Sequence, residues 1–151
     1  MKLTSLITAA VAATTAVAGT NWDISSIEKA RHKDKTIACR DCLFDSLEAS
    51  ISDMFNQMAG GKNTGTATKK GDGHEVILKF RKTASGQVHK PEGSDLFEIA
   101  GFTVLDYNHP YAAQGCMSLK YLEKPQAELS FTINSKDYHF KNIPDACTVP
   151  A

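Results

Sequence analysis

The clearest pattern in the chain is a helical one between residues 43 and 58. Large apolar side chains recur there every three or four residues, which places them on one face of an α-helix. Polar residues fill the opposite face, Asp41 is the expected N-cap, and Gly60-Gly61 is the expected C-terminal stop. The pattern predicts one main amphipathic helix that packs against another element. Its apolar positions are Leu43, Phe44, Leu47, Ile51, Met54, Phe55 and Met58.

Alternation of apolar and polar residues predicts four strands after this helix. The glycine-rich and lysine-rich stretch 60–73 is expected to be a flexible loop. Gly101 indicates a bulge or bend, and a turn over 134–137 is expected to lead into a last strand with Tyr138 and Phe140. The alternating positions are Val76, Leu78 and Phe80; Phe97, Ile99, Phe102 and Val104; Met117, Leu119 and Tyr121; and Leu129, Phe131 and Ile133.

One helix followed by a series of strands indicates an α+β fold in which the amphipathic helix packs on an antiparallel β-sheet. Residues 19–38, which precede the helix, are mostly polar and predict a short helix or an N-terminal arm. No internal repeat is visible, and the 133 residues from 19 to 151 have the size of a single domain.

The first residues have the features of a removable signal peptide. Lys2 supplies a positive charge, and the uncharged run 3–17 ends at Ala16-Val17-Ala18, a small-x-small cleavage pattern. This run is shorter than the roughly 20 apolar residues that a membrane helix needs, and threonines interrupt it. We therefore expect removal of residues 1–18 and a single secreted domain over residues 19–151, without a membrane segment.

The charge of the expected secreted domain is close to zero. Lys2 is the only charged residue before position 19, which leaves 16 basic and 17 acidic residues and a net charge of −1. Such a domain has no general attraction for nucleic acid or for an anionic membrane. No cofactor or metal ion is expected, and the domain is expected to be a monomer.

Four cysteines, Cys39, Cys42, Cys116 and Cys147, follow the leader. An even number in an exported domain predicts two disulfides, for which three pairings are possible. Because Cys39 and Cys42 are so close in sequence, we expect one of them to bond Cys147 and the other Cys116. The C-x-x-C spacing before a helix also suits a redox site, but the strong preceding strand typical of such sites is missing. A zinc site is disfavoured because Cys116 and Cys147 are isolated.

Two residues of the predicted sheet suit acid–base chemistry. Glu98 is expected to point away from the apolar strand face formed by Phe97 and Ile99. His139 alternates with Tyr138 and Phe140 in the last predicted strand, so its side chain is expected on the opposite face from theirs. A carboxylate and an imidazole on one sheet face could act as acid and base, although exposed polar strand residues are the commoner interpretation. No known catalytic motif accompanies them. A separate aromatic surface patch is predicted at Tyr107, His109 and Tyr111.

The Ala/Thr-rich leader, the size of the following domain and the few cysteines resemble the small secreted effector-like proteins of plant-associated fungi. The order of parts is similar to the fungal guanyl-specific ribonuclease fold and its non-catalytic effector relatives. That resemblance implies a bond from Cys39 or Cys42 to Cys147. It also implies catalytic roles for Glu98 and His139, but the segment 128–131 lacks the family's arginine, and Arg81 is the only arginine in the predicted sheet region.

The resemblance therefore implies a secreted, non-enzymatic interaction protein, a fungal virulence effector that binds a host protein or another host component, outside cells or after delivery into host tissue. One alternative is a secreted ribonuclease-like enzyme that uses Glu98, His139 and Arg81. Another is a module that binds the cell wall or a surface.

Overall fold

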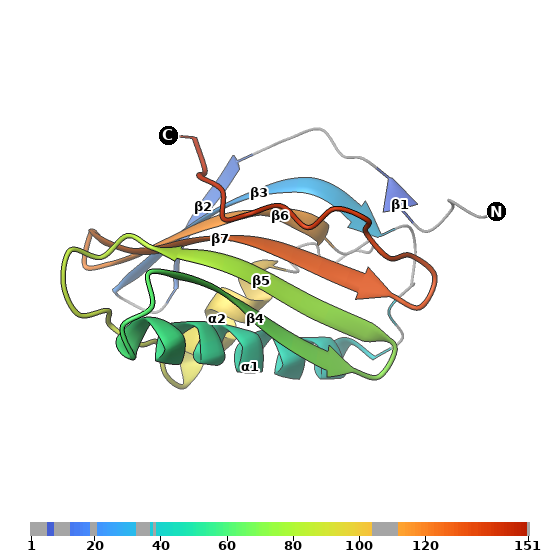
Figure 1. The fold of residues 1–151 in the computed structure, drawn as a ribbon, viewed down its shortest axis with the longest axis horizontal. Coiled ribbons are helices and arrows are strands. Elements are labelled where there is room, and N and C mark those ends of the chain that lie inside the picture. Colours follow the sequence, from blue (N-terminus) through green and yellow to red (C-terminus); the bar gives the residue numbers. More distant parts are fainter. Residues whose placement is uncertain are drawn as a thin grey trace.

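The computed structural model has two helices on one face of an antiparallel sheet (Figure 1) and describes residues 6–7, 13–18, 21–32, 37, 39–103 and 112–150. This α+β architecture with two disulfides confirms the predicted fold class. The helices are α1 (Arg40–Ala59) and α2 (Ser94–Thr103), and the strands are β1 (Leu6–Ile7), β2 (Ala13–Ala18), β3 (Trp22–His32), β4 (Thr64–Gly71), β5 (His74–Lys82), β6 (Ala112–Tyr121) and β7 (Lys124–Ser135).

The sheet runs in the order β1-β3-β6-β7-β5-β4, and β2 also pairs with β3. Every described pairing is antiparallel. Residues 22–32, for which the sequence predicts a helix or an arm, form β3 and pair with β6. Both β1 and β2 come from the stretch that the sequence predicts to be a removable leader.

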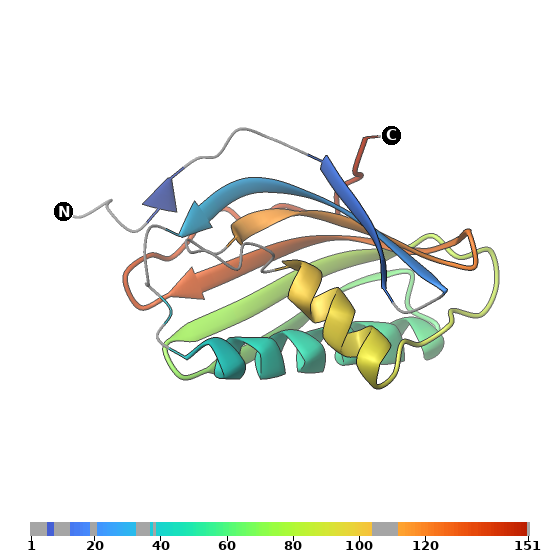
Figure 2. The same cartoon turned by 180° about the vertical axis from the view of Figure 1, so that it is seen from behind.

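The main core lies between α1 and the sheet face that it covers, which we call the inner face (Figure 2). The predicted apolar positions of α1 are all buried, and α1 contacts β4 and β5. The alternation predicted for β5, β6 and β7 is confirmed, because the inner-face side chains of these strands are buried. They include Val76, Leu78, Phe80, Met117, Leu119, Leu129, Phe131 and Ile133.

The prediction of a strand through Phe97 and Ile99 is wrong, because this segment is helix α2. Its buried residues are Ile99, Ala100 and Thr103. Ala100 and Thr103 follow Ile99 by one and four residues, which places all three on one side of a helix. Gly101 is not a strand bulge. A Cβ built there would lie 3.3 Å from the ring of Phe44, so the glycine lets α2 approach α1 closely.

The expected flexible loop over 60–73 is also wrong in its second half, which forms the edge strand β4. Only Ala67 of this strand is buried, because β4 has a neighbour on one side alone. Gln57 of α1 donates a hydrogen bond to the carbonyl oxygen of Thr66 at 3.0 Å. An edge strand that buries so little has no alternation by which to recognise it.

Residues 136–150 form no strand, which corrects the prediction for Tyr138 and Phe140. This segment, which we call the C-terminal strap, crosses the sheet face opposite the helices, the outer face (Figure 1). The rings of Tyr138 and Phe140 contact each other edge to face, with centroids 5.2 Å apart.

The predicted disulfide pairing is wrong: the bonds join Cys39 to Cys42 and Cys116 to Cys147. Because α1 begins at Arg40, its N-cap is Cys39 and not the predicted Asp41, which lies inside the first turn. Cys42 lies in the same turn, at a Cα–Cα distance of 5.2 Å from Cys39. That separation is within the normal range for a disulfide. The strap brings Cys147 over Cys116 of β6 at a Cα–Cα distance of 5.5 Å.

Candidate functional site

The structure does not bring the residues of the predicted ribonuclease-like site together. Glu98 is exposed on α2, which lies on the inner side of the sheet, whereas His139 is exposed on the strap at the outer side (Figures 1 and 2). Arg81 is on β5 and pairs with Glu128 of β7. The predicted patch of Tyr107, His109 and Tyr111 lies outside the described residues.

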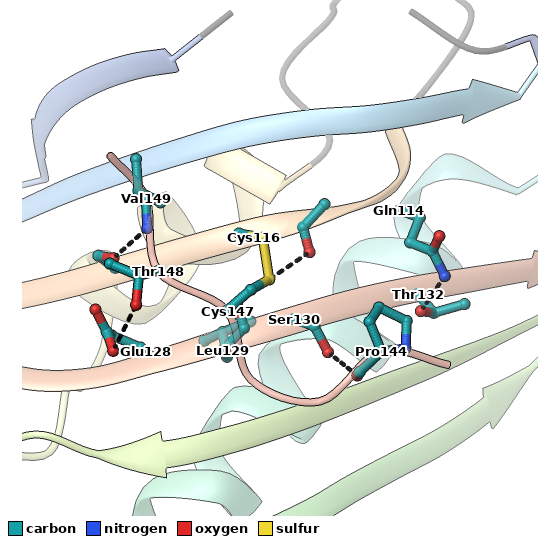
Figure 3. The surroundings of a disulfide bond; sticks show 12 residues. Gln114, Cys116, Glu128, Leu129, Ser130, Thr132, Pro144, Cys147, Thr148 and Val149 are labelled. Carbon is teal, nitrogen blue, oxygen red and sulfur yellow. Dashed lines mark hydrogen bonds between the residues drawn. A yellow bond between two sulfur atoms is a disulfide. The ribbon is translucent and has the colours of Figure 1, made fainter. Parts of the chain in front are cut away.

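The Cys116–Cys147 bond fixes the strap on the outer face (Figure 3). Ser130 Oγ of β7 donates to the carbonyl oxygen of Pro144 at 2.6 Å, and the Val149 N–H donates to Ser118 Oγ at 3.4 Å. The strap therefore satisfies polar groups of β6 and β7 that would otherwise meet solvent, and it leaves Ser130 fully buried.

Two pockets border this strap. One is lined by Lys79, Arg81 and Asp145 among others, and the second by Ser118, Glu128 and Val149 among others. The charged groups of the first pocket are paired: Lys79 Nζ lies 3.7 Å from Asp145 Oδ1, and Arg81 pairs with Glu128 of the second pocket, which Lys120 also lines. An anionic ligand in the first pocket would have to displace these carboxylates, so that pocket offers no open phosphate site.

A buried serine–histidine pair joins α1 to the β4–β5 hairpin. His74 Nε2 lies 2.8 Å from Ser46 Oγ, and His74 is only 6% exposed. Burial lowers the pKa of His74, and nearby Asp72 opposes this shift only in part. Because both side chains are shielded from solvent, a substrate cannot reach the serine, and the pair acts as a structural link.

The most distinctive surface lies at the tip of the β6–β7 hairpin. The ring of His89 stacks on Tyr121 with centroids 3.6 Å apart and an interplanar angle of 8°. Next to Tyr121, Leu122 is 56% exposed, although it is a large apolar residue. Trp22 is fully buried and its ring contacts both His89 and Tyr121. We call His89, Tyr121 and Leu122 the hairpin-tip patch.

The backbone at this tip is in an unfavourable conformation for its residues. Leu122 has a φ of 50° and Glu123 a φ of 65°. Two-residue hairpin turns of this kind favour Asn-Gly, because left-handed backbone costs other residues about 1–2 kcal/mol each. The turn is held in place by a hydrogen bond from the Leu122 N–H to the carbonyl oxygen of Asn21, at 2.8 Å.

The loop that carries His89 is fixed to the same end of the sheet. The N–H of His89 donates to Gln126 Oε1 at 2.8 Å, and the N–H of Thr83 donates to the Gln126 carbonyl oxygen at 3.0 Å. The imidazole is therefore positioned by β7 as well as by its stacking on Tyr121. Sequence reasoning missed this patch, although an apolar Leu122 within the polar turn is a signal that could have pointed to it.

Within the described part of the chain, no group of three or more His, Cys, Asp or Glu side chains is arranged to hold a metal ion. None of the helices in that part is both long and apolar enough to span a membrane.

Comparison with protein-family models finds no match, and comparisons with curated proteins and with solved structures find no significant similarity. The geometry and chemistry of the chain itself are therefore the basis for assigning a function.

Proposed function

We propose that the chain is an exported, non-enzymatic interaction protein that binds its partner through the hairpin-tip patch. The observation that carries the proposal is Leu122, a large apolar side chain that is 56% exposed on a left-handed backbone. Neither feature favours folding, since burial and an Asn-Gly turn would both be more stable. A residue that costs stability at a surface is typical of a binding site.

The composition of the patch suits a protein partner. The stacked rings of His89 and Tyr121 form a rigid aromatic surface beside the aliphatic Leu122. Aromatic anchors of this kind contribute large contact area with little loss of side-chain entropy. The fully buried Trp22 beneath supports them, so the patch is preorganised.

Export is supported by two features. The leader pattern ends at Ala18, and both disulfides are of the kind that persist in oxidising compartments. Cleavage after Ala18 would remove β1 and β2 and leave β3 as an edge strand. N-terminal sequencing of protein collected from the medium of a secretory host should start at Gly19, and a start at Met1 would contradict the export proposal.

The resemblance to fungal effector-like proteins extends the proposal to a host component as the partner, and to a role in virulence. The test is site-specific photo-crosslinking with the secreted protein. A photo-reactive amino acid at Leu122 should give a defined adduct with one protein from plant extracellular fluid. The same probe at Asp137, an exposed residue beyond the opposite end of β7, is the matched control and should not. Equal adducts from both positions would contradict a specific patch.

The enzymatic and surface-binding alternatives have their own assays. A working ribonuclease would need an acid, a base and a cation around the phosphate. We expect no RNA cleavage, and cleavage lost in both Glu98→Gln and His139→Ala would overturn the proposal. Retention on insoluble cell-wall polysaccharide that is lost in Tyr121→Ala would instead assign the hairpin-tip patch to a surface-binding module.

A further inference from the structure

The two disulfides differ in what they hold together. Cys116–Cys147 links positions 31 residues apart, and Cys116 is only 1% exposed. Cys39–Cys42 links positions three apart at one end of α1, and both residues are half-buried. In the chain-entropy treatment the longer loop contributes more to the stability of the fold than the shorter one. The short, accessible bridge is therefore the one that the fold can more easily open.

The local chemistry favours a thiolate at Cys39 once the bridge is open. Cys39 is the N-cap of α1, and its Sγ accepts a hydrogen bond from the Cys42 N–H at 3.1 Å. The free N–H groups of the first turn and the helix dipole stabilise negative charge at this position. Arg40 and Asp41, between the cysteines, carry opposite charges that offset each other. The stabilisation of a thiolate at Cys39 therefore comes from the helix N-terminus.

An exposed aromatic surface adjoins this turn of α1. Phe97 of α2 is 54% exposed and stacks on Phe44, with centroids 5.3 Å apart. The guanidinium of Arg40 lies over the same Phe44 ring, 5.5 Å from its centroid. Phe97 and Leu122 are the exposed large hydrophobic side chains of the described residues, and Phe97 is the one connected to the C-x-x-C turn, through Phe44 and Arg40. This surface suits an apolar or aromatic segment of a polypeptide.

We infer that Cys39–Cys42 is a redox-active disulfide that oxidises a dithiol in a peptide segment docked on Phe97. A substrate thiolate bonds to Cys42 Sγ, and the Cys39–Cys42 bond breaks with Cys39 leaving as the stabilised thiolate. The second substrate thiolate then attacks the mixed disulfide and releases Cys42. Two electrons pass from the substrate to the protein, and the protons lost by the two substrate thiols are balanced by protonation of the two cysteines. A small disulfide such as oxidised glutathione would restore the bridge.

This activity is independent of the hairpin-tip patch, and a single-turnover experiment tests it. The secreted, oxidised protein is mixed with a synthetic peptide that contains two cysteines flanked by Phe and Leu. Alkylation and mass spectrometry then identify the reduced cysteines. We expect one peptide disulfide per protein, with Cys39 and Cys42 alkylated and Cys116 and Cys147 still bonded. No exchange, or equal reduction of both bridges, would overturn the inference. Cys39→Ser/Cys42→Ser should abolish the exchange.

The docking part is tested separately by Phe97→Ser. Because Phe97 is exposed, this change leaves the core intact, and it should slow exchange with the aromatic peptide roughly three- to tenfold. Exchange with dithiothreitol, which is too small to use the surface, should be unchanged. Lys62→Ser is the control, since Lys62 lies beyond the other end of α1, about 30 Å along its axis. An unchanged peptide rate, or equal slowing with dithiothreitol, would refute docking on Phe97.

Discussion

Replacement of both Cys116 and Cys147 by alanine should destabilise the protein more than the same replacement of Cys39 and Cys42. The Cys116–Cys147 bond closes a loop of about 32 residues, which corresponds to roughly 4 kcal/mol of chain entropy. The Cys39–Cys42 bond closes a ring of about four residues, which corresponds to roughly 2 kcal/mol. We therefore expect the two double variants to differ by about 2 kcal/mol in the free energy of unfolding.

The longer bond also determines how well the strap is held. Without it, the strap keeps hydrogen bonds such as that from Ser130 Oγ to the Pro144 carbonyl oxygen, which contribute only about 1 kcal/mol each. In the Cys116→Ala/Cys147→Ala variant we therefore expect the strap to detach locally before the rest of the sheet unfolds. Lys136 and Lys141 are exposed at its start, so trypsin should then cut there at concentrations of urea that leave the core folded.

Urea unfolding followed by tryptophan fluorescence measures both variants, because Trp22 is fully buried in the core. The m-value should be compared as well, since a changed m-value would indicate a change in the unfolded state. Equal midpoints, or a larger loss in the Cys39→Ala/Cys42→Ala variant, would refute the argument that loop length decides the contribution. Resistance of the Cys116→Ala/Cys147→Ala variant to trypsin would refute the proposed local detachment of the strap.

Three further predictions concern single elements. Ile51→Ala should cost about 2–5 kcal/mol in urea unfolding because Ile51 is 1% exposed in the core, whereas Glu48→Ala should stay within about 0.5 kcal/mol; equal effects would show that the helix face is misassigned. Burial lowers the pKa of His74 from 6.5, so the folded state favours the neutral imidazole, and stability should fall as the pH drops below 6.5. His74→Gln should weaken that decline, and an unaltered pH profile would show that His74 is not its source. Leu122→Asn/Glu123→Gly should raise the thermal midpoint because it relieves two left-handed residues; a lower midpoint would mean that Leu122 contributes packing.

Periodic burial is the information that the sequence contains most directly. The apolar face of α1 and the alternation of β5, β6 and β7 were predictable because each of these elements buries one face against the same core. Their order along the chain was sufficient to indicate an α+β fold with an antiparallel sheet. The leader pattern up to Ala18 likewise predicts export from local composition alone.

Tertiary contacts decided the remaining features. Helix α2 forms where Gly101 can approach Phe44, and β4 is a strand although it buries only Ala67, because β5 pairs with it. Tertiary contacts also decided where the candidate sites formed.

Cys147 bonds Cys116 because the strap crosses the outer face, and the left-handed turn that exposes Leu122 is held by the hydrogen bond from its N–H to the Asn21 carbonyl oxygen. Each of these outcomes depends on a neighbour distant in sequence, and the local pattern of hydrophobic and polar residues does not contain that neighbour's position.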